Sequence, residues 1–176
     1  EKTPPLRVYR SPTVRGTTVC PSVEGATNWM SPSFDAARGL YFVQALERCS
    51  VFTKSSRGFE PGQSFYGGTT RRVPGETGGK VLRALEVATG RIAWELPQVG
   101  DGDTWAGVLS TSSGLVFTGE DDGAFTALDG RDGRRLWRFE ANAAWRGSPM
   151  TYLANDRQHI AIAGGGVIYA FALGEP

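Results

Sequence analysis

The feature that most constrains the fold of this chain is a short segment that occurs twice. It reads ALEVATGRIAWEL at 84–96 and ALDGRDGRRLWRFE at 127–140, so that the Ala, Gly and Trp of the first copy recur 43 residues later. Each copy reads as a strand, a short turn closed by Gly and a second strand that carries Trp, which is the pattern of a β-hairpin. A repeat of about this length is typical of one four-stranded blade of a β-propeller. We therefore expect an all-β fold built from four-stranded antiparallel blades.

Short apolar strands complete the pattern of the blades. They are GLYFVQAL at 39–46, GLVFTGE at 114–120 and RQHIAIAGG at 157–165. The sequence predicts a first blade over 28–96, a second over 105–140 and an incomplete third over 145–173. The strands expected in them are 28–37, 39–47, 79–86 and 91–96, then 105–112, 114–120, 123–129 and 134–140, and finally 145–153, 158–163 and 167–173.

Two segments lie outside the expected blade strands. Residues 50–78, rich in Gly, Ser and Arg, are predicted to form a loop inserted in the first blade, and residues 1–17 an extended, Pro-containing lead-in. The segment 18–173 would then be a partial propeller.

The number of blades limits how this chain can exist. Known propellers close with about four to eight blades, because an open ring leaves sheet edges and blade faces exposed. About three blades cannot close a ring, so we expect the chain to be a segment of a larger propeller or to associate with a second copy of itself. The missing outer strand of the third blade fits a ring whose last outer strand comes from the other end of a longer chain.

Composition supports the all-β class and limits the partners. Of 176 residues, 24 are Gly and 10 are Pro without a collagen-like period, which fits many tight turns. The 19 basic and 18 acidic side chains leave a net charge of +1, so no nucleic acid partner is expected. No apolar run approaches the roughly 20 residues that cross a bilayer, and the chain starts with Glu1 and Lys2 rather than a signal peptide. We expect no membrane span and a chain from which any export signal has been removed.

The chain has two cysteines, Cys20 and Cys49, and neither belongs to a CxxC or CxxCH pair. This excludes a zinc ribbon and a covalently bound haem within the chain. A bridge between the two would close a loop whose ends are 29 residues apart and would stabilise the fold by about 3 to 4 kcal/mol in the chain-entropy model. Two reduced, buried thiols are the alternative on composition alone.

The spacing of Ala, Gly and Trp in the two hairpins resembles the tryptophan-docking motif of the quinoprotein alcohol dehydrogenases, which depend on pyrroloquinoline quinone (PQQ). Three longer stretches are also similar to the C-terminal part of that family. They are CPSVEGATNWMSPSFDAARGLYFVQALERC, TWAGVLSTSSGLVFTGEDDGAFTALDGRDGRRLWRF and GSPMTYLANDRQHIAIAGGGVIYAFAL. The resemblance covers about residues 18 to 173.

This resemblance implies an eight-bladed propeller in the periplasm that oxidises primary alcohols. It also implies PQQ bound beside a calcium or lanthanide ion, and electron transfer to a cytochrome c. Asn28 and Trp105 match positions at which the family contacts the cofactor, and the spacing of Cys20 and Cys49 resembles that of a family disulfide, which suits an oxidising compartment. The family's metal ligands and catalytic aspartate lie in earlier blades. We therefore expect no catalytic residue and no metal ligand in this chain, which should be inactive alone.

The remaining tryptophans and charged motifs have structural interpretations. Trp94 and Trp137 are expected to pack between blades, as is Trp29 near its strand start, whereas Trp145 is a candidate to line a cavity. Trp105 could instead line an axial channel without contacting a cofactor. We expect turns, not metal or phosphate sites, at GDGD (100–103), EDDG (120–123) and GGG (164–166).

A function from another class also fits the pattern of blades. Non-catalytic propeller scaffolds share Trp-containing repeats and bind no cofactor, but they have no need for Asn28 and Trp105 at the propeller axis. Arg71 and Arg72, in the predicted loop, are expected to face solvent, with contact to an acidic cytochrome as the alternative.

Overall fold

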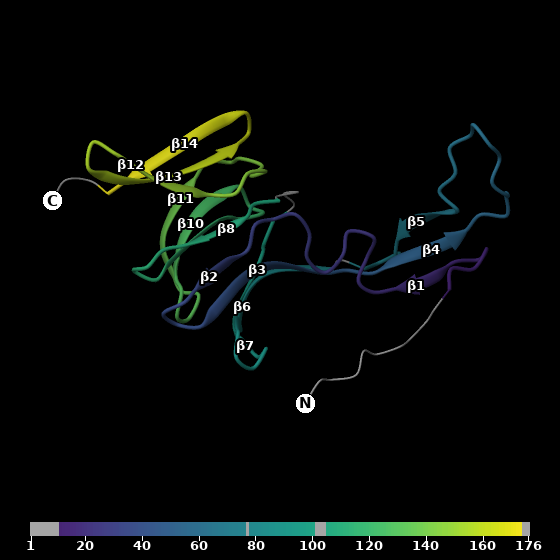
Figure 1. The fold of residues 1–176 in the computed structure, drawn as a ribbon, viewed down its shortest axis with the longest axis horizontal. Helices are drawn as coiled ribbons and strands as arrows, with labels where there is room; N and C mark the ends of the chain where they lie inside the picture. Colours follow the sequence, from purple (N-terminus) through teal and green to yellow (C-terminus); the bar gives the residue numbers. More distant parts are fainter. Residues whose placement is uncertain (1–10, 77, 101–104, 174–176) are drawn as a thin grey trace. The chain divides into compact units, whose positions relative to one another are not determined.

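The computed structural model describes residues 11–76, 78–100 and 105–173, and it contains strands and turns throughout these ranges (Figure 1). The described residues form no helix, so none of their segments is a helix that could span a membrane. Contacts divide the chain into two compact units. One comprises residues 1–26 with 46–78, and the other comprises 27–45 with 79–176.

The second unit begins with a four-stranded sheet that corresponds to the predicted first blade. Its strands are β2 (Ser33–Asp35), β3 (Leu40–Glu47), β6 (Gly79–Glu86) and β7 (Ile92–Pro97), in the order β2-β3-β6-β7. Three of the four strands match the predicted ranges closely. Strand β2 is much shorter than predicted, because residues 28–32 form an irregular segment ahead of it.

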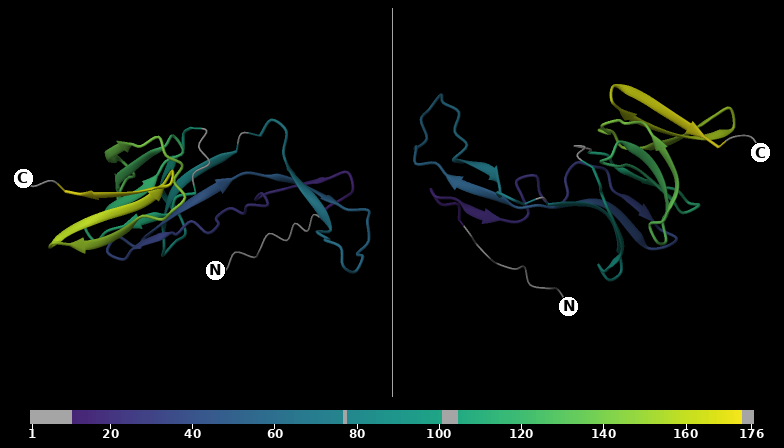
Figure 2. Two further views of the ribbon diagram at one scale, coloured as in Figure 1. Left: turned by 90° about the horizontal axis from the view of Figure 1, so that it is seen from above. Right: turned by 180° about the vertical axis from the view of Figure 1, so that it is seen from behind.

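The other two blades follow along the chain in the same unit. The second has β8 (Val108–Ser110), β9 (Leu115–Gly119), β10 (Ala124–Asp129) and β11 (Arg135–Glu140), in the order β11-β10-β9-β8. The third has β12 (Met150–Ala154), β13 (Arg157–Gly164) and β14 (Val167–Ala172), and its three strands pair in sequence order. They are drawn in yellow-green to yellow near the C-terminus in both views of Figure 2. The predicted all-β fold of propeller blades is confirmed.

Apolar residues on the facing sides of adjacent blades are buried against each other, as expected of stacked repeats. Two clusters of buried side chains result, one between the first and second blades and one between the second and third. The first contains Leu40, Phe42, Leu82, Ala84, Trp94, Val108, Val116 and Leu128. The second contains Ala106, Phe125, Ala143, Trp145, Ile160 and Ile162.

Trp94 shows how the repeated hairpins hold adjacent blades together. Its side chain is buried, and its indole N–H donates a hydrogen bond of 2.9 Å to the carbonyl oxygen of Gly130 in the second blade. A Cβ atom at Gly133 would lie 2.7 Å from the Trp94 ring, so only glycine lets the ring approach this turn. Trp137 likewise packs on the rings of Phe125 and Phe171, although 41% of it remains exposed. The predicted packing role of both tryptophans is confirmed.

Polar side chains also link the first and second blades. Lys80 of β6 forms a buried ion pair of 2.8 Å with Asp121, which follows β9. Gln44 of β3 donates a hydrogen bond of 3.0 Å to the hydroxyl of Thr118 in β9. Buried polar groups are costly unless they are paired, so these contacts favour one relative placement of the two blades over others.

The first unit contains a three-stranded sheet that corrects the prediction of a loop over 50–78. Strand β4 (Ser50–Lys54) pairs with β1 (Thr17–Val19) on one side and with β5 (Gly68–Arg72) on the other, both antiparallel. Thr and Val, which favour strands, supply the pairing residues. Of the predicted lead-in, residues 1–10 lie outside the described residues, while Thr13 and Gly16 form a turn that enters β1.

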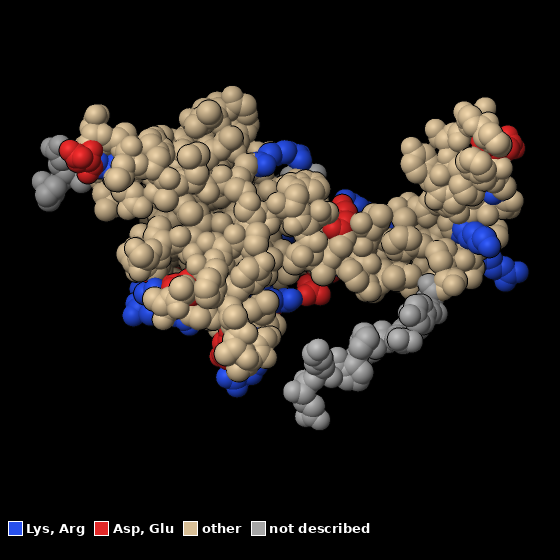
Figure 3. Space-filling view, in the orientation of Figure 1, with Lys and Arg blue, Asp and Glu red and all other residues tan. Residues whose placement is uncertain are grey.

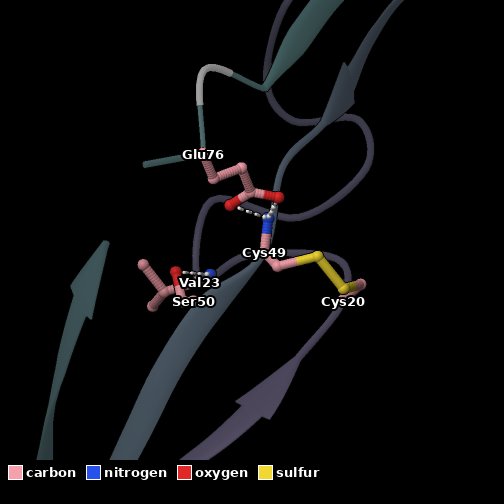
Figure 4. Close-up of a disulfide and its surroundings, with 5 residues drawn as sticks. All are labelled: Cys20, Val23, Cys49, Ser50 and Glu76. Atoms are coloured by element: carbon pink, nitrogen blue, oxygen red, sulfur yellow. Dashed lines mark hydrogen bonds between the residues drawn. A yellow bond between two sulfur atoms is a disulfide. The ribbon is translucent and has the colours of Figure 1, made fainter. Parts of the chain in front are cut away.

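A disulfide joins Cys20 to Cys49 within this unit, which confirms the predicted pair and rules out two reduced thiols (Figure 4). The backbone N–H of Cys49 donates to both carboxylate oxygens of Glu76, at 3.1 and 3.0 Å. Ser50 accepts a hydrogen bond of 3.4 Å from the N–H of Val23. The bridge thus fixes the start of β4 to the segment that follows β1.

Candidate functional site

Asn28 and Trp105 occupy comparable places in two adjacent blades of the second unit. Asn28 lies in the irregular segment before β2, and Trp105 lies in the irregular segment before β8. Asn28 is exposed and Trp105 is partly exposed. Residues of this kind at strand ends are available to a ligand in a way that the buried tryptophans of the core are not.

Trp29, the residue after Asn28, contacts Trp105. Its ring stacks on the ring of Trp105, with centroids 4.8 Å apart and planes inclined by 30°. Its backbone N–H donates a hydrogen bond of 3.0 Å to the side-chain oxygen of Asn28. The structure therefore brings the two predicted residues together through Trp29. Trp29 thus packs on a tryptophan of the adjacent blade, as expected, although 65% of this residue is exposed.

Hydrogen bonds between the two inner segments set their separation. The N–H of Val108 donates to the carbonyl oxygen of Ser31, at 2.8 Å. Ser33 accepts a bond of 2.8 Å from the N–H of Ser110, and the two serine hydroxyls are 2.6 Å apart. Together these contacts hold the segment that carries Asn28 and Trp29 beside the segment that carries Trp105.

The third blade joins the same group through its first residues. The backbone N–H of Trp105 donates to the carbonyl oxygen of Trp145, at 2.8 Å, and that of Gly107 donates to Gly147, at 3.4 Å. Trp145 itself is completely buried and packs on the rings of Phe125 and Tyr169, so the suggestion that it lines a cavity is wrong. Because the backbone N–H of Trp105 is occupied, its indole is the group that this residue can present to a ligand.

The acidic motif at 120–122 is explained by ion pairs. Glu120 is fully buried and accepts hydrogen bonds from Arg135, at 2.9 and 2.7 Å, while Asp121 pairs with Lys80. Burial alone would raise the pKa of Asp122, but its contacts with Arg138 outweigh this effect and hold the pKa below its ordinary value. Among the described residues, no group of three or more His, Cys, Asp or Glu side chains is placed to hold a metal ion. The motif GDGD extends outside the described residues.

The other predicted turn is confirmed, and the arginine pair is exposed as expected, but on a strand rather than in a loop. Gly165 and Gly166 have φ values of 58° and 81° and form the turn between β13 and β14, so GGG is a hairpin turn. Arg71 and Arg72 are exposed on β5. On the face shown in Figure 3, the basic side chains of the described residues stand in small groups, some of them beside acidic ones.

Two cavities lie away from these residues. In the first unit a cavity of about 460 Å³ lies beside β4 and β5 and the segment between them, and includes Thr53, Phe65 and Tyr66. In the second unit an apolar groove of about 420 Å³ runs between the second and third blades and is lined by Phe117, Trp137 and other residues. Neither contains Asn28, Trp29 or Trp105. The geometry that singles these three residues out is the contact of Trp29 with each of the other two.

Sequence reasoning missed the role of Trp29 and of the serine pair. Trp29 directly follows Asn28, and its position near a strand start suggested packing. What distinguishes it is a stacking partner that is 76 positions away in the sequence, and no local pattern reports such a contact. The serines gave no signal, because Ser is common in irregular segments of any kind.

Known proteins resemble this chain over most of its length. Residues 96–160 match the family model described as "Glucose/ethanol/alcohol dehydrogenase, beta-propeller domain". The quinoprotein alcohol dehydrogenase PedH of Pseudomonas putida is 30% identical over 148 residues, which are 84% of this chain and 24% of that protein. Methanol dehydrogenase [cytochrome c] subunit 1 of Methylobacterium organophilum is 33% identical over 170 residues, covering 90% of this chain and 27% of its own length. The chain thus spans about a quarter of the length of these curated relatives.

The fold is similar to that of solved structures from the same group of enzymes. The quinohemoprotein alcohol dehydrogenase ADHIIG of Pseudomonas putida HK5 superposes with a TM-score of 0.75 at 24% identity, over 85% of this chain and 24% of that one. The solved structure supports the β-propeller fold of the blades. In sequence, the chain is similar over most of its length to one part of the quinoprotein alcohol and methanol dehydrogenases.

Proposed function

We propose that this chain is the C-terminal part of a PQQ-dependent alcohol dehydrogenase that oxidises primary alcohols, and that it supplies Asn28 and Trp105 to the cofactor pocket. The observation that carries this proposal is the contact of both residues with Trp29. The ring of Trp29 stacks on Trp105, and its N–H bonds to Asn28. Two positions that match the family's cofactor contacts thus form one continuous group.

The chemistry of this group fits the edge of PQQ. A flat conjugated ring that bears carbonyl oxygens is bound by aromatic faces and edges together with amide donors. Trp105 offers an indole and Asn28 an amide, and both lie at strand ends where a ligand can reach them. PQQ, when bound, supplies the two-electron redox chemistry, as cofactors of this kind do.

The residues of this chain have a binding and positioning role in the proposal. Asn28 orients the cofactor through its amide group. The ring of Trp105 limits how the cofactor can tilt and keeps water from the edge of PQQ that faces this chain. Orientation of this kind accelerates a reaction because the reacting atoms are held in place before chemistry begins.

The other parts of the proposed enzyme lie outside these residues. Such a reaction requires a calcium or lanthanide ion, which would polarise a carbonyl group of the cofactor. It also requires a carboxylate, which would take the proton of the alcohol. We assign both to blades that this chain does not contain, and we expect a cytochrome c to accept the electrons. A periplasmic location is part of the proposal and is supported by the disulfide, since such bonds persist in oxidising compartments.

Equilibrium dialysis of the purified chain against PQQ in the presence of calcium tests the proposal. We expect saturable binding, weakened about three- to tenfold in each of Asn28→Ala and Trp105→Ala, because single aromatic contacts and hydrogen bonds contribute roughly 0.5 to 1.5 kcal/mol. Tyr66→Ala, which removes a 92% exposed aromatic side chain from the first unit, is the control and should leave the affinity unchanged.

Two results would contradict the proposal. Absence of saturable binding would show that this chain does not present part of the pocket, as expected for a propeller that acts only as a scaffold. Binding of equal strength in the wild type and in both variants would place the ligand elsewhere. Addition of ethanol and an artificial electron acceptor should give no turnover, because the base and the metal are assigned to other blades.

A further inference from the structure

We infer that Trp29 is a positioning residue that fixes the orientation of the Trp105 ring. The part that this plays in cofactor binding rests on the proposed function, whereas the orientation of the ring is a property of the chain alone. No family motif or predicted contact assigns a ligand-directed role to Trp29, which the sequence alone would place among the packing residues.

Trp105 is held through its backbone and through its ring. Its backbone is anchored by the hydrogen bond from its N–H to the carbonyl oxygen of Trp145, at 2.8 Å. A backbone bond does not determine the two side-chain torsions that aim the indole. Among the ring contacts of the described residues, Trp105 has one, and its partner is Trp29 at 4.8 Å. The orientation of the Trp105 ring is therefore set by Trp29.

Trp29 is itself held on both sides, which makes it an effective support. Its N–H is bonded to the side chain of Asn28 at 3.0 Å, and its neighbour Met30 is buried. The carbonyl oxygen of Ser31 and the hydroxyl of Ser33 then receive hydrogen bonds from Val108 and Ser110, in the segment that begins with Trp105. The two rings consequently project from backbones whose separation is fixed.

Trp29 contributes little buried apolar area among the described residues. Burial of a tryptophan contributes apolar area, but 65% of this residue remains in contact with solvent. Trp94 and Trp145, in contrast, are buried in the two clusters between blades. An exposed ring that covers one face of a partly exposed ring stabilises the fold little and leaves the remaining surface of Trp105 for a ligand.

The test uses the full chain labelled with 5-fluorotryptophan, whose five resonances are assigned by single Trp→Phe variants. In Trp29→Ala we expect the Trp105 resonance to shift and to narrow, because its ring becomes mobile. Trp29→Phe retains an aromatic face and should restore most of the original position and width. Trp137→Ala, which removes a tryptophan from an outer strand, is the control and should leave the Trp105 resonance unchanged.

Two further measurements separate positioning from loss of structure. Hydrogen exchange of the backbone N–H of Trp105 should stay slow in Trp29→Ala, since its bond to Trp145 does not involve the ring. PQQ affinity should fall about three- to tenfold in Trp29→Ala and recover in Trp29→Phe, the range expected for one aromatic contact.

An unchanged Trp105 resonance in Trp29→Ala would overturn the inference, as would a changed resonance accompanied by fast exchange of the Trp105 N–H. If the wild type does not bind PQQ, the proposed function fails while the fluorine resonances still decide whether Trp29 orients Trp105. If the wild type binds PQQ and Trp29→Ala binds it equally well, the inference fails while the proposed function stands.

Discussion

Gly133 shows how one residue decides whether two blades pack. Its φ of +75° is nearly the same as the +72° of its repeat partner Gly90, so alanine is strained by a similar amount at both sites. The two sites differ in their surroundings. A Cβ at Gly133 would lie 2.7 Å from the Trp94 ring, whereas a Cβ at Gly90 would meet nothing within 4 Å.

Gly133→Ala should therefore destabilise the second unit more than Gly90→Ala does. Backbone strain costs about 1 to 2 kcal/mol in both variants, and displacement of the Trp94 ring adds about 1 to 3 kcal/mol in Gly133→Ala alone. Urea unfolding followed by tryptophan fluorescence gives both values. An equal loss of unfolding free energy in the two variants would show that the contact between Trp94 and this turn contributes no stability.

Asp35, at the turn between β2 and β3, should make the stability of the fold depend on pH. Burial of its carboxylate tends to raise the pKa, but hydrogen bonds from the Arg38 side chain and from the backbone N–H groups of Arg38 and Ala37 outweigh it and lower the pKa from its ordinary value. A lowered pKa in the folded state means stability that is present above the ordinary pKa and is lost as the pH falls through the folded value.

Asp35→Asn should lower the free energy of unfolding by about 1 to 2 kcal/mol at pH 7, because hydrogen bonds to a charged acceptor are replaced by weaker ones. The difference from the wild type should begin to shrink as the pH falls below about 4, where the carboxylate of the unfolded chain becomes protonated, and should be lost once the pH passes the lower pKa of the folded state. Thermal unfolding between pH 7 and pH 2 measures this, with Glu60→Gln at an exposed carboxylate as control. A difference that is independent of pH would contradict the assignment.

At the scale of the element, Glu120 ties the turn after β9 to strand β11. It is fully buried, accepts a hydrogen bond of 2.6 Å from Thr126 and pairs with Arg135 at 2.7 Å. Glu140 pairs with Arg138 in the same sheet, but its side chain is 69% exposed. The two carboxylates therefore differ in burial, while each contacts an arginine of β11.

Glu120→Gln should lower the stability of the second blade by about 1 to 3 kcal/mol, because buried hydrogen bonds to a charged acceptor are replaced by weaker ones. Glu140→Gln should cost less than about 1 kcal/mol, as usual for an exposed ion pair. Circular dichroism melting curves compare the two variants with the wild type. A smaller loss for Glu120→Gln than for Glu140→Gln would show that the buried pair is not stabilising.

The disulfide should protect the sheet of the first unit. Replacing both cysteines, in Cys20→Ser/Cys49→Ser, removes a closed loop and should destabilise this unit by about 3 to 4 kcal/mol. Hydrogen exchange of the N–H groups in β1 and β4 measures the effect in this unit separately from the blades. Reductant should reproduce it in the wild type and have no effect in the variant. Unchanged exchange would mean that β4 is held by its strand pairing alone.

Elements were predictable where the sequence repeats itself. The hairpins β6-β7 and β10-β11 follow from two aligned copies, each with its Gly and Trp in register. Strands β4 and β5 belong to no repeat and flank a long Gly- and Ser-rich segment, so composition alone suggested a loop. In the candidate site, Asn28 and Trp105 were predicted from a resemblance to a family. The role of Trp29 could not be predicted, because it depends on a long-range contact that no local pattern encodes.

At the scale of the whole molecule, the third blade retains much exposed apolar surface. Leu153, Ile168 and Leu173 are 76%, 77% and 88% exposed. Surface of this kind is normally covered by a neighbouring repeat. We propose that further blades of a longer propeller, or a second copy of the chain, cover it, which accords with a chain that spans about a quarter of its relatives.

The most direct test of the account is a PQQ titration of the 5-fluorotryptophan-labelled chain in the presence of calcium, followed by fluorine NMR. The account predicts that the resonances of Trp29 and Trp105 shift saturably with PQQ, while those of Trp94 and Trp137, which pack between blades, do not move. No saturable shift, or shifts confined to tryptophans other than this pair, would contradict the claim that this chain forms part of a PQQ pocket.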